Sequence, residues 1–123
     1  MQKIVLLSLF LLSATLLLAQ VTPRALKADI KTPNAICAAC KTKIESTVPK
    51  AIDGLVKINV IISRGITQVS YYPDRTNIEE LKTAISNCGF DADNVLANTD
   101  VYVKLPECCK KSQDQKVPPK PKQ

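Results

Sequence analysis

The chain has 123 residues, no histidine, no tryptophan, and a single methionine at position 1. Its net charge is +6, but the residues after Cys109 contribute +4 (five lysines, one aspartate) and Lys3 contributes +1, so residues 20–109 carry only +1. This nearly neutral stretch argues against a nucleic-acid-binding protein. The absence of histidine excludes Cys-His and Ser-His nucleophile arrangements and histidine-based catalytic zinc sites, so we expect no enzyme.

The N-terminus has the pattern of a secretory signal peptide. Lys3 gives a positive start, residues 4–18 are almost entirely apolar, and Ala19 offers a small residue for cleavage. An apolar run of about 15 residues is typical of signal peptides and shorter than a membrane span. We therefore predict a signal peptide over residues 1–19 and a periplasmic or secreted protein, with an uncleaved anchor as the alternative.

A first strand and a first helix are predicted next. Residues 25–31 alternate loosely in polarity and favour a strand. From residue 38, the side chains of Cys40, Ile44 and Val48 recur every four residues and predict an apolar helical stripe. Pro49 is expected to end this helix.

A β-hairpin is predicted to follow. Val56, Ile58, Val60 and Ile62 alternate with more polar positions, which favours a half-buried strand. Residues 63–65 form the turn into a second strand over residues 66–72.

The second helix has clear boundary signals. Asn77 is a good N-cap with Glu80 as its capping-box partner, and Gly89 is placed to end the helix. We expect residues 91–96 to form an edge strand and residues 101–105 an added turn, with a strand as the alternative there. The apolar face of this helix is Ile78, Leu81, Ile85 and Cys88.

The predicted element order is strand, helix, strand, repeated twice. It indicates an α+β protein of the βαββαβ type, in which an antiparallel sheet carries both helices on one face. The domain is expected over residues 25–109. Residues 110–123 are rich in lysine and proline and predict a disordered tail.

Cys37 and Cys40 are the strongest functional signal. The pair is predicted to lie at a loop-to-helix junction, where the helix dipole and nearby Lys41 and Lys43 favour thiolates. Two thiolates suit Cu(I), Ag(I) or Hg(II) in a near-linear site. Zn(II) or Cd(II) requires about four ligands and therefore further cysteines.

These residues resemble the heavy-metal-associated domain of copper chaperones, soft-metal P-type ATPases and periplasmic mercury-binding proteins. The resemblance covers about residues 27–95: the Cys37/Cys40 motif is followed by Ile44-Glu45, Val48, Gly54-Leu55 and Gly89-Phe90. It implies a ferredoxin-like fold, a metal-binding Cys37 and Cys40 pair, and a role in sequestering the ion or handing it on. The implied partners are a membrane metal transporter or another metal-binding domain.

The loop before the first helix departs from the family pattern. Ala35 stands where copper-handling members usually carry a buried methionine, and Asn34 and Ile36 replace the usual glycine and threonine. We therefore expect this loop to be anchored differently.

The other three cysteines are candidate accessory ligands. Cys88 is either a third thiolate or a small buried side chain, and its apolar-face position favours burial. Cys108 and Cys109 either form disulfides elsewhere or fold back on Cys37 and Cys40 to complete a four-thiolate site for Zn(II) or Cd(II).

The sequence thus predicts an exported protein that binds a soft metal ion, Cu(I), Hg(II) or Zn(II)/Cd(II), through Cys37 and Cys40. Two alternatives remain. A thiol-disulfide oxidoreductase uses the same dithiol placement, although here Ile36 precedes the motif where such enzymes usually have an aromatic residue. A disulfide-stabilised interaction module is consistent with an oxidising compartment.

Overall fold

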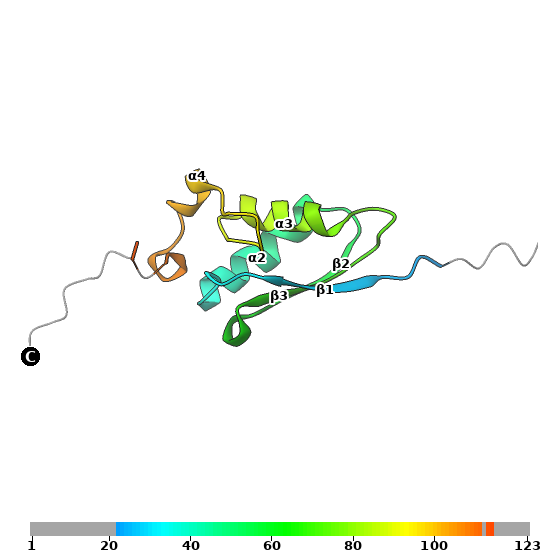
Figure 1. The fold of residues 1–123 in the computed structure, drawn as a ribbon, viewed down its shortest axis with the longest axis horizontal. Helices are drawn as coiled ribbons and strands as arrows, with labels where there is room; N and C mark the ends of the chain where they lie inside the picture. Colours follow the sequence, from blue (N-terminus) through cyan, green and yellow to red (C-terminus); the bar gives the residue numbers. More distant parts are fainter. Residues whose placement is uncertain (1–21, 112, 115–123) are drawn as a thin grey trace, which may run out of the picture.

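The computed structural model describes residues 22–111 and 113–114, and these form one sheet covered by helices on one face (Figure 1). The predicted signal peptide and residues 115–123 of the predicted tail lie outside the described residues. The elements follow in this order: β1 (Leu26–Lys31), α2 (Ala38–Ala51), β2 (Leu55–Ile61), the 3-10 turn η2 (Ile62–Arg64), β3 (Ile66–Tyr71), α3 (Ile78–Asn87), α4 (Thr99–Tyr102) and the 3-10 turn η3 (Glu107–Cys109).

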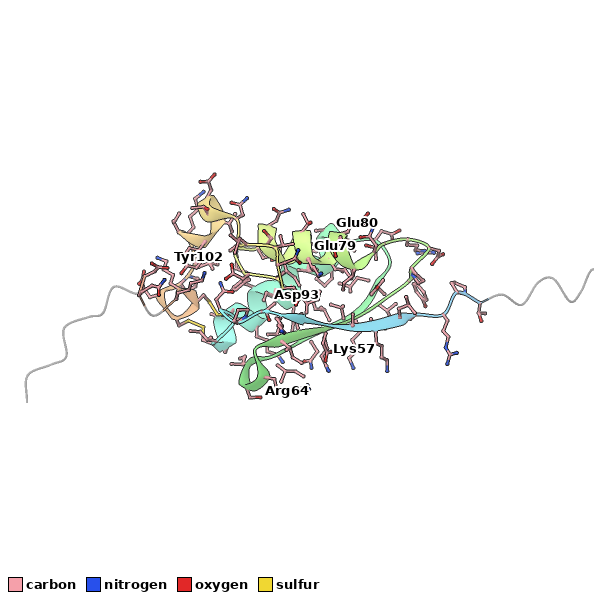
Figure 2. The ribbon with its side chains drawn as sticks, in the orientation of Figure 1. Lys57, Arg64, Glu79, Glu80, Asp93 and Tyr102 are labelled. Carbon is pink, nitrogen blue, oxygen red and sulfur yellow. A yellow bond between two sulfur atoms is a disulfide. The ribbon has the colours of Figure 1, made fainter. Side chains whose placement is uncertain are left out.

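The sheet has three antiparallel strands in the order β1-β3-β2. β3 lies in the centre, pairing Thr67 with Ile30 of β1 and with Val60 of β2. The predicted hairpin is formed by β2 and β3, joined through η2 and Gly65, whose φ of 61° suits glycine. The sheet face opposite the helices carries polar side chains such as Lys57 (Figure 2), as expected for an antiparallel sheet with one solvated face.

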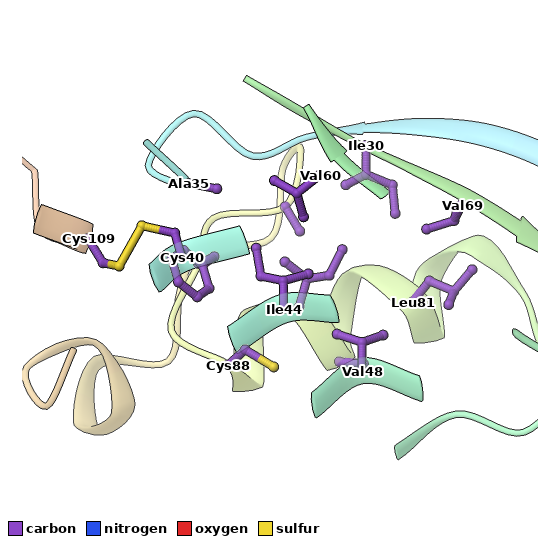
Figure 3. Packing of buried hydrophobic residues seen from close by; sticks show 14 of the residues in the cluster. Ile30, Ala35, Cys40, Ile44, Val48, Val60, Val69, Leu81, Cys88 and Cys109 are labelled. Atoms are coloured by element: carbon purple, nitrogen blue, oxygen red, sulfur yellow. A yellow bond between two sulfur atoms is a disulfide. The ribbon is translucent and has the colours of Figure 1, made fainter. Parts of the chain in front are cut away.

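The core lies between the sheet and the two long helices (Figure 3). The predicted stripe of α2 is confirmed, because Cys40, Ile44 and Val48 are all fully buried. In α3, Leu81 and Ile85 are fully buried as well. The 3.6-residue period of each helix therefore places its apolar stripe against the sheet.

Pro49 does not end the first helix as predicted. It lies inside α2, which continues to Ala51. The missing N–H of a proline removes only one hydrogen bond, and the backbone N–H of Ile52 still donates to the carbonyl of Val48 at 3.2 Å. Since Ile52 also packs against the core, the last turn of the helix is retained.

The alternation predicted for the first hairpin strand fails at Val56. A β-bulge lies between Leu55 and Lys57, and the Val56 side chain is 51% exposed. A bulge places two residues opposite one partner and reverses the face on which the preceding side chains lie. Leu55, rather than Val56, consequently packs against the core.

The edge strand predicted at residues 91–96 is not formed; within the described residues the sheet ends at β1. Only an isolated bridge joins Ala92 and Val95. Asp93 takes the place of the strand beside the end of β1: its backbone N–H donates to the carbonyl of Lys31 at 2.9 Å, and its carboxylate accepts from the backbone N–H of Lys31 at 2.7 Å. Asp93 has a positive φ of 52°, which bends the chain away from the strand direction.

The segment after residue 96 forms α4, the added turn expected from the sequence, rather than a strand. Among the described residues, every helix is too short or too polar to cross a lipid bilayer.

Candidate metal centre

Cys37 and Cys40 lie at the start of α2, as the motif predicts. Cys37 is the N-cap residue, with extended backbone angles and no hydrogen bond from its side chain to the helix, while Cys40 lies in the first turn. Their Sγ atoms are 3.2 Å apart. Cys40 is fully buried and Cys37 partly exposed, so two sulfurs converge at the boundary between core and solvent.

The electrostatics of this helix start favour thiolates. The first turn of α2 carries no acidic residue, and the positive end of a helix dipole stabilises negative charge. The side chain of Lys41, however, lies toward β2 rather than toward the sulfurs. Its Nζ donates to the carbonyl of Val60 at 3.0 Å, and the carboxylate of Glu45 accepts from the backbone N–H of Val60 at 2.8 Å. Lys41 and Glu45 therefore cover the edge of β2.

Asn34 anchors the loop between β1 and α2, residues 32–37, which we call the metal loop. It is buried, its Oδ1 accepts from the backbone N–H of Asp91 at 2.9 Å, and its Nδ2 lies 3.5 Å from the carbonyl of Gly89. The next residue, Ala35, is buried too, and its N–H donates to the carbonyl of Thr32 at 3.1 Å. A polar tie to residues 89–91 thus anchors the loop at the position where the family usually has glycine.

Cys108 and Cys109 lie next to Cys37 and Cys40, although the paired residues are 71 and 69 positions apart in the sequence. The structure pairs them in two disulfides, Cys37 with Cys108 and Cys40 with Cys109, with Cα separations of 6.2 and 5.7 Å. Figure 3 shows the bond between Cys40 and Cys109. The Sγ atoms of Cys37 and Cys109 are 3.5 Å apart, although no bond joins them. Four sulfurs therefore gather in one cluster at the start of α2.

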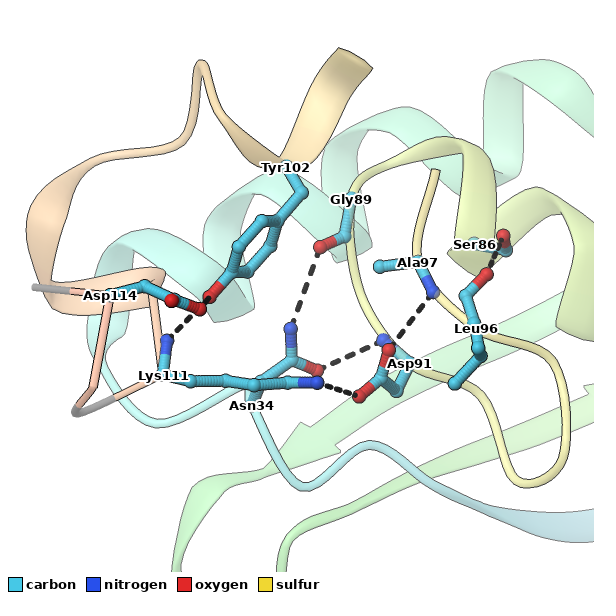
Figure 4. Close-up of polar contacts among 9 residues, drawn as sticks. All are labelled: Asn34, Ser86, Gly89, Asp91, Leu96, Ala97, Tyr102, Lys111 and Asp114. Atoms are coloured by element: carbon cyan, nitrogen blue, oxygen red, sulfur yellow. Dashed lines mark hydrogen bonds and ion pairs between the residues drawn. The ribbon is translucent and has the colours of Figure 1, made fainter. Parts of the chain in front are cut away.

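A polar network holds the segment that carries Cys108 and Cys109. We call it the C-terminal clasp; its residues are Asn34, Asp91, Tyr102, Lys111 and Asp114 (Figure 4). The Nζ of Lys111 is 3.0 Å from the carboxylate of Asp91, and the backbone N–H of Lys111 donates to the Tyr102 hydroxyl at 2.7 Å. That hydroxyl donates to Asp114 at 2.8 Å. The hydrogen bond and charge of Asp91 raise the pKa of Lys111, so Lys111 stays charged at neutral pH.

Lys111 and Asp114 fall within the tail predicted from residue 110 onward. Their contacts show that the ordered segment continues past that boundary.

Apolar packing supports the same segment. Leu105 is buried in the core, and a Cβ on Gly89 would lie 3.1 Å from its side chain and 3.2 Å from the backbone nitrogen of Tyr102. Gly89 has a φ of 95°, a conformation that favours glycine. It ends α3 as predicted and allows the segment around α4 to pack closely.

Cys88 is separate from the sulfur cluster. It is a free, buried thiol, and burial raises its pKa. The structure therefore does not bring Cys88 to the metal loop, in keeping with the small buried side chain that its apolar-face position favours.

The sequence predicts the four clustered cysteines as candidate ligands but gives no indication of the clasp. Asn34 differs from the family pattern without revealing its partners, and Tyr102 and Lys111 belong to no recognisable motif. Their partners are distant in sequence, and no local periodicity reports such contacts.

A family model described as "Heavy-metal-associated domain" matches residues 29–91, a little over half of the chain. A copper-exporting P-type ATPase of Staphylococcus aureus is 38% identical over 56 residues, which cover 46% of this chain and 7% of the ATPase. The match thus spans only a small part of that relative.

Two solved structures have a similar fold. The N-terminal domain of a potential copper-translocating P-type ATPase from Bacillus subtilis, in its Cu(I)-loaded state, is 28% identical with a TM-score of 0.51 and covers 55% of this chain and 82% of that domain. Oxidized MerP from Ralstonia metallidurans is 19% identical with a TM-score of 0.53, covering 56% and 94%. These matches confirm the ferredoxin-like α+β class.

Proposed function

This chain belongs to the heavy-metal-associated domain family, and from that premise we propose that it is an exported, non-enzymatic protein that binds a soft metal ion through the thiolates of Cys37 and Cys40. One observation carries the proposal: the two Sγ atoms lie 3.2 Å apart at the uncapped start of α2. Reduced thiols in that position need only small movements to place one ion between them.

The ion bound between these two sulfurs is a soft monovalent or divalent cation. Cu(I) is the first candidate and Hg(II) the second. Thiolates are the preferred ligands of such ions, and the described residues offer no histidine or methionine near the site. The names of the S. aureus and B. subtilis relatives refer to copper, which supports placing Cu(I) first.

The protein sequesters the ion or hands it on to a membrane metal transporter or to another domain of the same kind. Ile36 lies beside Cys37 and is 45% exposed, so an apolar contact is available next to the sulfurs. Export rests on residues 1–19, whose pattern is that of a signal peptide.

A second candidate function is a disulfide-stabilised interaction module. The observation that favours it is the pairing of all four clustered cysteines in disulfides. If this is the function, material taken from its native compartment has blocked thiols and no metal.

An oxidoreductase is the third candidate, and catalytic reduction of a protein disulfide by the purified chain is its test.

The main test is a titration of the reduced full-length protein with Ag(I) or Cu(I) under anaerobic conditions. We expect one tight equivalent in the wild type and its loss in the double variant Cys37→Ser/Cys40→Ser. Cys88→Ser is the matched control, because Cys88 lies outside the cluster, and it should bind as the wild type does. Unchanged affinity in the double variant would place the site elsewhere.

Export and redox state need a separate measurement. Native mass spectrometry of the protein isolated after expression of the full chain reports signal cleavage, bound metal and disulfide count together. The mass of a chain beginning near Gln20, with reduced thiols and a bound ion, is the expected result.

A further inference from the structure

The position of Cys108 and Cys109 does not depend on sulfur bonds alone. The clasp holds Lys111 on one side of these residues through Asp91 and Tyr102, and buried Leu105 holds the other side. None of these contacts involves a sulfur atom, so reduction of the two disulfides breaks none of them directly. They provide a means of keeping the two thiols next to Cys37 and Cys40.

We infer that the reduced protein holds a four-thiolate centre, made by Cys37, Cys40, Cys108 and Cys109, for a divalent cation of the Zn(II) or Cd(II) class. The inference rests on the proposed thiolate chemistry of Cys37 and Cys40 and extends it by two ligands. Such cations prefer four ligands in a tetrahedron, and a two-cysteine loop alone does not supply them.

Three of the four sulfurs lie close enough together to bind one ion. With Zn–S bonds of about 2.3 Å, the sulfurs of a tetrahedral site are ~3.8 Å apart. The Sγ atoms of Cys37, Cys108 and Cys109 all lie within 4.8 Å of one another, and Cys37 is 3.2 Å from Cys40 and 3.5 Å from Cys109. The Sγ of Cys40 lies outside that set of three, so once the disulfides open, forming the tetrahedron requires Cys40 and Cys108 to approach each other.

The surroundings suit an enclosed ion. Cys40 and Cys109 are fully buried, so two ligands lie away from solvent, while Cys108 is exposed and marks the side from which the ion enters. The positive end of α2 offsets part of the negative charge of four thiolates around a divalent cation.

Metal and disulfides compete for the same sulfurs. Each disulfide takes up two electrons and two protons from a dithiol reductant to give two thiols, and the metal then displaces the thiol protons. Reduced protein is therefore the starting material for the test.

The experiment titrates the reduced full-length protein with Cd(II) and counts its sulfur ligands by X-ray absorption. We expect four sulfurs in the wild type and two in Cys108→Ser/Cys109→Ser, with Cd(II) affinity at least about 100-fold weaker in the variant, since even outer-shell changes cost 10–100-fold. Cys88→Ser, which keeps all four clustered thiols, is expected to match the wild type.

Ag(I) binding separates this inference from the proposed function. Cys108→Ser/Cys109→Ser should still bind one Ag(I) tightly, which also shows that the variant is folded at the metal loop. If the wild-type protein does not bind Ag(I), the proposed function is overturned. Retained Ag(I) binding, together with two sulfurs around Cd(II) in the wild type or equal Cd(II) affinity in the variant, would overturn the four-thiolate centre alone.

A clasp variant gives a second readout with all cysteines present. Asp91→Asn removes the charge that pairs with Lys111, so the segment should spend more time away from the loop. We expect Cd(II) affinity to fall by about tenfold while Ag(I) affinity stays unchanged. Equal losses for both ions would contradict a specific role of the C-terminal segment.

Discussion

The two long helices begin in different ways, although they occupy equivalent places in the two halves of the fold. At the start of α3, the Oδ1 of Asn77 accepts from the backbone N–H of Glu80 at 3.0 Å, and the Glu80 carboxylate accepts from the Thr76 hydroxyl at 2.8 Å. At the start of α2, Cys37 makes no such bond. The first helix gives up its cap to keep two sulfurs at its N-terminus.

The difference shows where each helix start obtains its stability. The cap of α3 is made by Thr76, Asn77 and Glu80, which are close in sequence, and it stabilises the folded state by about 1 kcal/mol. The start of α2 is instead joined to Cys108 and Cys109, 71 and 69 residues along the chain. At the start of α2, disulfides to distant residues take the place of a local cap, because a cysteine occupies the N-cap position.

The largest expected effect comes from reducing the disulfides. Closing a loop of this length stabilises the folded chain by about 4 kcal/mol through the entropy of the unfolded state, and the second bridge adds little because it closes nearly the same loop. Urea unfolding with and without a dithiol reductant measures the difference. Cys108→Ser/Cys109→Ser, which lacks both bridges, should respond far less to the reductant. Equal stability of the oxidised and reduced wild type would contradict the comparison.

A smaller effect is expected at α3. Asn77→Ala removes the side-chain acceptor for Glu80 and should lower the free energy of unfolding by about 1 kcal/mol. Asn77→Ser retains a capping oxygen and is the matched control. Ag(I) affinity should be the same in both variants, and a change in it would show that the two helix starts are coupled.

The uncapped start of α2 predicts a gain of stability on losing the metal ligand. In reduced protein, Cys37→Ser places a hydroxyl at the N-cap and should raise the free energy of unfolding by about 0.5–1 kcal/mol. Cys40→Ser, inside the first turn, offers no cap and should show no such gain. Metal-free, reduced samples are compared by urea unfolding, and a loss of stability in Cys37→Ser would argue that the Cys37 side chain already stabilises the helix start.

The smallest effect concerns Cys88, the cysteine outside the cluster. Burial raises the pKa of its thiol above the ordinary 9.0, so above pH 9.0 the unfolded chain releases this proton while the folded chain keeps it. Stability should therefore fall as the pH rises past 9.0, and less so in Cys88→Ala. Urea unfolding of the oxidised protein below and above this pH checks the sign, and identical pH dependence in the two proteins would contradict it.

Local patterns predicted much of the fold. The stripe of Cys40, Ile44 and Val48, the cap at Asn77 and the stop at Gly89 all appear in the structure as expected. Each depends on residues within one or two helical turns. The local prediction was wrong where a neighbouring strand or a packing contact determines the conformation, as for Val56 at the bulge and Pro49 inside α2.

Composition and spacing alone indicated the chemistry: with no histidine and no methionine beyond Met1, any soft-metal site must use thiolates, and the spacing of Cys37 and Cys40 places two of them at one helix start. Which other sulfurs join them depends on how the chain packs. Cys88 lies in the core, whereas Cys108 and Cys109 reach the loop because the clasp and Leu105 bring the end of the domain back to its beginning. Contacts between residues about 70 positions apart depend on how the whole chain packs, and no short-range pattern records them.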